Sequence, residues 1–153
     1  NPTYYNDLIG GYVEESESLQ EGQSVEIKGI NEFAGISGSG AVFRDMLKTT
    51  TAKSLFVYND EFYNHLSAIT VNDFEEGQAY YIGTGVDNGT MDALAAKIIA
   101  DAAIESIDTE EGVEAVKREV DGETYYFVMN HTDKVKSFND IELKAYESKI
   151  IKN

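Results

Sequence analysis

The sequence predicts an α+β protein with a mostly antiparallel or mixed β-sheet, one long amphipathic helix and a small antiparallel β-sandwich at the end. Three observations predict this fold class. Short runs of β-branched and aromatic residues recur along the first half of the 153-residue chain. A helical apolar period follows in the middle, and only β-type segments come after it.

The first elements are short. Tyr4, Tyr5, Leu8 and Ile9 precede Gly10-Gly11, a pattern typical of one or two helical turns that end at a glycine. The acidic segment Glu14–Gln23 is expected to be a solvated loop. Ser24–Lys28 alternates between polar and apolar residues, which predicts a half-buried strand.

Further strands are expected up to residue 82. The glycine-rich segment Gly35–Gly40 is interpreted as a flexible loop, because it lacks the Lys-Ser/Thr ending of a phosphate-binding loop. The predicted strands lie at 41–47, 54–58, 68–71 and 79–82. The last two are joined by residues 72–78, which are expected to form a hairpin loop.

One convincing helix follows these strands. Its apolar residues recur at helical spacing and share one stripe: Met91, Leu94, Ala95, Ile98, Ile99 and Ala102. Asp87, Asn88 and Thr90 are candidate caps for its first free amides. The pattern decays by Ile107, and the polar segment Asp108–Gly112 lacks any period. We therefore expect two domains, at residues 1–108 and 112–153.

The second domain, residues 112–153, is predicted to form a β-hairpin with additional strands. Val113–Val120 and Glu123–Asn130 flank Asp121-Gly122, a two-residue turn in which both residues need positive φ. The simplest register pairs Val116 with Phe127 and Ala115 with Val128. Two more strands are expected within 135–138 and 143–151. A few strands make only a small core, so we expect this domain to be stabilised by the preceding domain.

Composition and charge exclude several classes of function. The chain has 28 acidic and 12 basic residues and a formal charge of −16, so nucleic-acid and membrane-surface partners are not expected. Without cysteine there is no disulfide, thiolate metal site or cysteine nucleophile. No apolar span or leader pattern is visible, which favours a cytoplasmic location. Because the chain opens at Asn1 without methionine, we expect it to be a piece of something longer.

No motif in the chain points to catalysis, a cofactor or a metal. The adjacent acid pairs Glu14-Glu15, Glu75-Glu76 and Glu110-Glu111 fall in predicted loops, where they are solvated charges. His65 and His131 have no partner at metal-ligand spacing. The Asn-x-Thr patterns at Asn88 and Asn130 are frequent by chance.

Aromatic residues crowd between positions 56 and 81, which allows two interpretations. Packing within the sheet accounts for most of them. A protein–protein interface is the functional alternative, since aromatic side chains are enriched at interface centres. The candidate interface residues are Phe62, Tyr63, Phe74 and Tyr80.

An ordered set of motifs resembles the family 42 glycoside hydrolases, which are mainly bacterial β-galactosidases. The segment from Leu55 to Thr84 matches their F-Y-A-G-x-P-A-V-T-x-N stretch and the A-Y-Y-V-G-T strand, with Asn64, His65 and Ser67 at the A, G and P positions. Asp7–Gly10 with Glu14-Glu15 is similar to their D-L-L-G…E-E stretch, Asn130–Thr132 to their L-N-H-T motif and Leu143–Tyr146 to their final L-x-P-Y strand. Together the motifs span nearly the whole chain.

The resemblance implies that catalysis and assembly lie in different domains of the family. In that family a catalytic (β/α)8 barrel comes first, a flavodoxin-like domain with trimer contacts follows, and a small antiparallel β domain closes the chain. A barrel needs about 250 residues, so the two catalytic glutamates of the retaining mechanism are expected outside this chain. This chain would be the inactive assembly region, with part of the flavodoxin-like domain, attached to the upstream barrel and forming a homo-oligomer.

Two rival functions stay open. One is a carbohydrate-binding or protein-interaction β module without enzymatic activity, although the chain has no tryptophan. The other is a free-standing small enzyme that uses carboxylates with His65 or His131. For the strand edge left by the missing part of the domain, we expect pairing with a second copy or a flattened edge.

Overall fold

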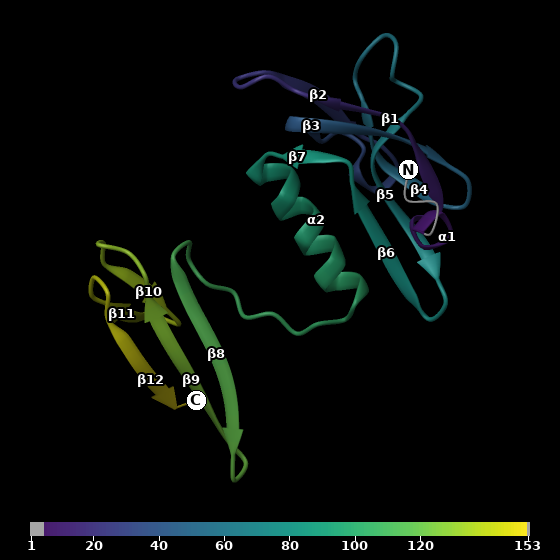
Figure 1. Ribbon diagram of the computed structural model, residues 1–153. Helices are drawn as coiled ribbons and strands as arrows, with labels where there is room; N and C mark the ends of the chain where they lie inside the picture. The colour runs from purple at the N-terminus through teal and green to yellow at the C-terminus, as the bar shows by residue number, and fades with distance from the viewer. Residues whose placement is uncertain (1–4, 153) are drawn as a thin grey trace. The chain divides into compact units, whose positions relative to one another are not determined.

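The computed structural model describes residues 5–152, and the chain divides into two compact units, Asn1–Ile98 and Ile99–Asn153. Both consist mostly of strands, with few helices, as the sequence predicts (Figure 1). Every strand pairing that the structure describes is antiparallel. Tyr4, which belongs to the predicted first helix, lies outside the described residues.

Among the described residues, the first unit contains seven strands, one short helix, a 3-10 turn and most of a longer helix whose last residues pass the unit boundary at Ile98. The elements in chain order are α1 (Asn6–Ile9), β1 (Gly11–Ser18), β2 (Ser24–Gly29), η2 (Asn31–Phe33), β3 (Ser37–Thr49), β4 (Lys53–Tyr58), β5 (Ser67–Phe74), β6 (Gly77–Ile82), β7 (Thr84–Val86) and α2 (Asn88–Asp101).

The strand pairings of this unit form a closed circuit. Strand β3 pairs with β2, β2 with β4, and β4 with β5. The circuit returns to β3 in two ways: Leu47 pairs directly with Ser67 of β5, and β6 continues across Gly83 into β7, which pairs with β3. Because β3 is 13 residues long and bulges near Val42, which has a φ of 71°, it serves several partners at once.

Two segments predicted as loops are strands. The prediction for Glu14–Gln23 was wrong in its first half, because β1 pairs with β3 along its length. Backbone hydrogen bonds hold this acidic edge strand, so its side chains need no burial, and charges on an edge discourage further pairing. The prediction of a flexible loop at Gly35–Gly40 was also wrong from Ser37 onward.

Steric constraints explain the glycines of β3. A Cβ atom on Gly38 would lie 2.0 Å from Thr90 Oγ1, and one on Gly40 would lie 2.4 Å from Thr84 Oγ1. Thr90 belongs to α2 and Thr84 to β7, and both side chains are buried. The missing side chains let α2 and β7 approach the strand closely.

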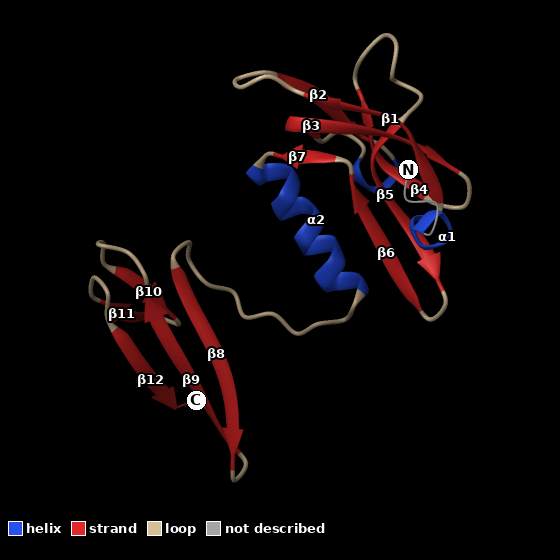
Figure 2. Cartoon of the chain, viewed as in Figure 1, coloured by secondary structure: helices blue, strands red, loops and turns tan. Residues whose placement is uncertain are grey.

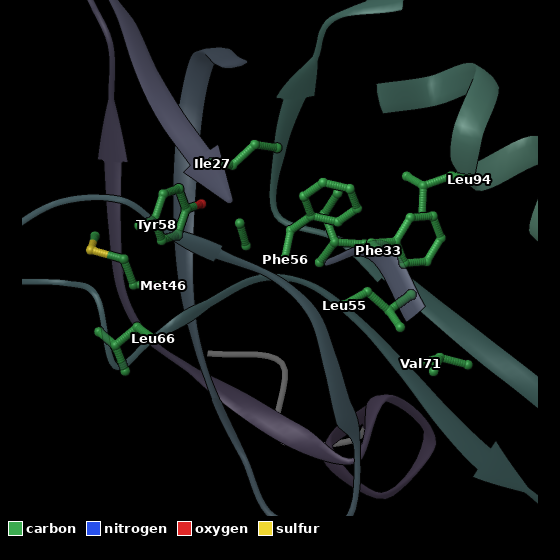
Figure 3. Packing of buried hydrophobic residues seen from close by; sticks show 11 residues of the cluster. Ile27, Phe33, Met46, Leu55, Phe56, Tyr58, Leu66, Val71 and Leu94 are labelled. Carbon is green, nitrogen blue, oxygen red and sulfur yellow. The ribbon is translucent and has the colours of Figure 1, made fainter. Parts of the chain in front are cut away.

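The core of the first unit lies inside this circuit. Figure 3 shows Leu55, Phe56 and Tyr58 of β4 among side chains from neighbouring elements. The Phe33 and Phe56 rings pack with centroids 5.1 Å apart, and Leu94 of α2 is 1% exposed. Burial of such large apolar side chains contributes about 1.5–3 kcal/mol each.

Helix α2, the longer helix in Figure 2, forms where the helical period predicts a helix. Of the large residues on the predicted apolar stripe only Leu94 is buried, while Met91, Ile98 and Ile99 are exposed. The side that faces the sheet passes through Thr90 and Leu94 instead. A helix this rich in apolar residues has more than one apolar face, so its period alone does not identify the buried one.

The second unit contains five strands in two sheets. They are β8 (Val113–Val120), β9 (Glu123–Asn130), β10 (Lys136–Phe138), β11 (Ile141–Leu143) and β12 (Ser148–Lys152). One sheet has the order β12-β9-β8 and the other pairs β10 with β11. Val113, Val128, Phe138 and Leu143 are buried together and form its small core.

The predicted hairpin of the second unit is confirmed in register. Val116 pairs with Phe127 and Ala115 with Val128, and Asp121 and Gly122 have φ values of 53° and 80°. The strand predicted within 143–151 is shorter than that range, since β11 ends at Leu143 and β12 begins at Ser148. Between them Tyr146 adopts a φ of 56°, which lies outside the β region that regular strand residues occupy.

Candidate functional site

The four candidate interface residues occupy two separate places on the first unit. Phe62 and Tyr63 lie in the loop 59–66 between β4 and β5, whereas Phe74 and Tyr80 lie on the β5–β6 hairpin. Loop 59–66 precedes β5, Phe74 is its last residue, about 25 Å along the strand, and Tyr80 pairs with Val71 in the middle of β5. The structure therefore does not bring the four side chains into one cluster.

Loop 59–66 is anchored beneath an exposed tip. The Arg44 guanidinium lies 4.5 Å from the centre of the Tyr63 ring and forms ion pairs with Glu17 at 2.6 Å and Asp60 at 3.5 Å. Leu66 at the end of the loop is buried, while Phe62 is 78% exposed. The loop thus holds Phe62 out on a supported base, as a contact residue requires.

The ion pairs of Arg44 with Glu17 and Asp60 set the ionisation of these groups. Burial by itself would lower the pKa of Arg44, but the bonds to Glu17 and Asp60 outweigh burial and raise it. The backbone N–H of Phe62 donates to Asp60 at 2.9 Å and, with Arg44, holds the pKa of that carboxyl below its usual value. Both groups stay charged at neutral pH, so neither exchanges protons with a substrate.

A second polar group surrounds Asp45, next to Arg44 in β3. The Tyr81 hydroxyl donates to Asp45 Oδ2 at 2.6 Å, and Ser16 Oγ donates to Oδ1. The Tyr58 hydroxyl donates to the backbone oxygens of Asp45 and Gly83 at 3.0 and 3.2 Å. Burial raises the pKa of both tyrosines, so these phenols remain protonated and tie strands together.

Asp87 caps α2 and ties the helix to β3. Its Oδ1 accepts the N–H of Thr90 at 2.9 Å, and its Oδ2 accepts the N–H of Ser39 at 2.5 Å. These two backbone donors, the Ser39 amide first, lower the pKa of Asp87 from 3.8 to about 2. Of the three predicted caps, Asp87 therefore makes the capping bonds.

In the second unit, Asn130 has a structural role. It is 3% exposed, and its Nδ2 donates to the carbonyl oxygens of Lys134 and Lys144 at 2.7 and 2.8 Å. Its Oδ1 accepts the N–H and hydroxyl of Thr132 at 2.9 and 2.8 Å. Glycosylation at this position would require the buried amide to leave these partners.

The remaining candidates do not assemble a reaction centre. His131 Nε2 lies 3.0 Å from Glu114 Oε2, and both side chains are more than half exposed. His65 belongs to loop 59–66 of the other unit. Glu110 accepts the N–H of Ser137 at 3.0 Å and pairs with Lys136 at 3.6 Å. Among residues 5–152, no three His, Cys, Asp or Glu side chains form a metal-binding group.

An exposed apolar row that the sequence reasoning missed crosses the outer face of the β12-β9-β8 sheet. Ile150 pairs with Phe127, which pairs with Val116. Phe127 is 41% exposed and Ile150 65% exposed, whereas the neighbouring Val128 faces the core. The register of the hairpin placed Val116 opposite Phe127, but the pairing of the third strand with β9 was not predicted.

Two family models match the chain in sequence order. The β-galactosidase trimerisation domain matches residues 1–105, and the β-galactosidase C-terminal domain matches residues 112–153. The chain belongs to the family 42 β-galactosidases. The resemblance derived from the motifs between Leu55 and Tyr146 is thereby confirmed.

Curated relatives within this family are bacterial. β-Galactosidase BgaP of Planococcus sp. (strain L4) is 30% identical over 149 residues, which cover 95% of this chain and 22% of that protein. LacZ of Heyndrickxia coagulans is 30% identical over 135 residues, 88% of this chain and 20% of that protein. The chain thus spans about a fifth of the length of these two relatives.

Solved structures share the fold. The β-galactosidase from Bacillus circulans sp. alkalophilus superposes with a TM-score of 0.86 at 24% identity, over 99% of this chain and 25% of that one. The enzyme from Rahnella sp. R3 gives 0.81 at 23% identity, over 97% and 24%. In the part of this family 42 chain that the structure describes, no helix is long and apolar enough to span a membrane.

The cap at Asp87 predicts an acid-sensitive contribution to stability. Asp87→Ala should lower the free energy of unfolding by about 1–2 kcal/mol at neutral pH. Since the folded pKa lies below the unfolded one, the charged cap stabilises fully above the unfolded value and progressively less as pH falls through the folded value. The difference from wild type should therefore shrink between about pH 4 and pH 2, measured by urea unfolding.

Matched variants separate charge from capping geometry. Asp87→Asn keeps a cap oxygen and should show a smaller loss without the acid dependence, while Asp92→Ala on the exposed side of α2 should change stability by less than about 0.5 kcal/mol. An Asp87→Ala deficit that stays constant from neutral pH down to about pH 2 would contradict the assignment.

Proposed function

We propose that this chain is the non-catalytic assembly and stability region near the C-terminal end of a longer β-galactosidase. The observation that carries the proposal is the ordered match of trimerisation and C-terminal models across a chain that spans about a fifth of its curated relatives. The whole protein would hydrolyse terminal β-D-galactosides with retention, by two carboxylates outside this chain.

The polar side chains of the described residues support a structural role. Asp87 and Asn130 are engaged by backbone amides and carbonyls, and Arg44 holds a loop in place. The adjacent acid pairs lie on the edge strand β1, in the β5–β6 turn and just before β8. Retaining hydrolysis needs two carboxyl groups about 5 Å apart on either side of a bound sugar, and the groups that are held most firmly here are saturated with protein partners.

The proposal also includes a more detailed description of the two domains. The first domain, residues 1–108, would be the later strands and closing helix of a flavodoxin-like domain, and residues 112–153 a small antiparallel sandwich. Its partners would be the upstream catalytic barrel of the same polypeptide and further copies, in a trimer. The cytoplasmic location and the covering of free strand edges stay predictions, as does the stabilisation of the second domain by the first.

An activity assay tests the absence of catalysis. The purified 153-residue chain should not hydrolyse a chromogenic β-galactoside above the buffer blank, since the catalytic carboxylates are proposed to lie elsewhere. An intact family 42 enzyme at the same molar concentration serves as the positive control. Turnover by the chain comparable to that control would refute the proposal.

Phe62, at the exposed tip of loop 59–66, is the first candidate residue for contact between copies in an oligomer. Phe62→Ser should weaken the oligomer about tenfold to a hundredfold without altering the circular dichroism spectrum, because a buried aromatic anchor contributes about 1–3 kcal/mol to an interface. Analytical ultracentrifugation over a concentration series measures the change. Val120→Ser, at an exposed position beside the β8–β9 turn, is the matched control, and an equal effect of both substitutions would argue against a specific role for Phe62.

A further inference from the structure

Helix α2 carries an apolar face that the described chain leaves exposed. Met91, Ala95, Ile98 and Ile99, here named the α2 stripe, are all exposed, and the three larger side chains are 44%, 36% and 37% exposed. Single exposed apolar residues are ordinary, but four on one helix side form a continuous patch. The stripe is therefore a candidate contact surface.

The α2 stripe is distinct from the side of the helix that packs on the sheet. The buried residues Thr90 and Leu94 define that side. Each residue advances about 100° around the helix axis, so Met91 and Ile98 lie about a quarter turn from Thr90. Because Leu94 occupies the position against the core, Met91, Ala95, Ile98 and Ile99 stay at the surface, where they are available to a partner.

The spacing of the stripe suits contact with another helix. Met91, Ala95 and Ile98 are separated by four and then three residues, which is the alternation of a helix–helix seam. The small Ala95 between two larger side chains leaves room for the facing helix to approach. Identical seams on several copies can meet around one symmetry axis, which closes the assembly.

The net charge of the chain indicates which partner is suited to the α2 stripe. The chain has a formal charge of −16, so two copies repel each other over most of their surface. The stripe contains no charged residue, and its neighbours on the helix alternate between acidic Asp92 and basic Lys97, the latter paired with Glu32 at 3.6 Å. Like-charged copies can therefore meet at this face without bringing acidic side chains into the centre of the contact.

We propose that the α2 stripe is a self-association face, at which the α2 helices of copies of this chain pack against one another. This inference rests on the proposed function, since the model that matches residues 1–105, and so contains α2, is that of a trimerisation domain. In a standard interface of about 800 Å² per partner, the stripe forms the apolar centre and the surrounding polar residues form the rim.

Light scattering and sedimentation of the 153-residue chain test the face with charge-matched variants. Met91→Glu/Ile98→Glu places two carboxylates in the stripe, and Met91→Gln/Ile98→Gln makes it polar without added charge. Ala96→Glu/Ala100→Glu adds the same charge at exposed positions on the other side of the same helix. Circular dichroism verifies that all variants retain the fold, which the exposure of the substituted residues predicts.

The expected result is an oligomeric wild type and an oligomeric Ala96→Glu/Ala100→Glu control, with both stripe variants shifted to monomer by at least tenfold in dissociation constant. Raising the salt concentration should strengthen wild-type association, because it screens repulsion between acidic copies. If wild type and stripe variants associate equally, the α2 stripe has another occupant, such as a preceding segment of a longer chain, and the inference fails while the proposed assembly role stands. A wild type that remains monomeric at high salt and millimolar concentration overturns both.

Discussion

The first unit depends on one steric constraint, the close approach of α2 and β7 to the glycine-containing half of β3. Gly38 and Gly40 leave no space for a side chain beneath Thr90 and Thr84. This approach lets Asp87 reach the backbone of Ser39 and lets β7 pair with β3. Without it the circuit of strands would return to β3 only at Leu47, and Leu94 would lose its place in the core.

Polar side chains reinforce that arrangement. Asp87 links helix to strand, and Tyr58 and Tyr81 link β4 and β6 to β3 through Asp45 and its neighbours. In the second unit Asn130 holds two turns by their carbonyl oxygens. Side chains with saturated hydrogen-bonding capacity stabilise a scaffold, which is what a region devoted to assembly requires.

The sequence predicted local features well wherever local physics decides them. The Asp121-Gly122 turn fixed the register of β8 and β9, and the helix 88–101 followed from its cap and its apolar period. Strand β1 was missed because an edge strand is held by its backbone, which leaves no side-chain pattern. The Gly35–Gly40 segment was misjudged because Gly38 meets Thr90, 52 positions away, and Gly40 meets Thr84, 44 positions away, and no local sequence pattern reports contacts so distant in the chain.

The candidate surfaces show the same limit. Aromatic crowding identified Phe62, and the structure supplies Arg44 as its support, a residue that nothing in its sequence context distinguishes. The period of α2 identified its apolar residues, but only packing decides which apolar side of the helix is buried. Under the proposed function, the exposed apolar faces of this acidic scaffold are the surfaces through which copies would assemble.

The central claim is that β3 tolerates no side chain where α2 crosses it, and one comparison of unfolding free energies tests this most directly. Gly38→Ala places a Cβ 2.0 Å from the buried Thr90 hydroxyl, whereas Gly77→Ala meets nothing closer than 3.9 Å. In urea unfolding followed by circular dichroism, Gly38→Ala should lose about 1–3 kcal/mol and Gly77→Ala less than about 0.5 kcal/mol. Equal stability of the two variants would contradict the account.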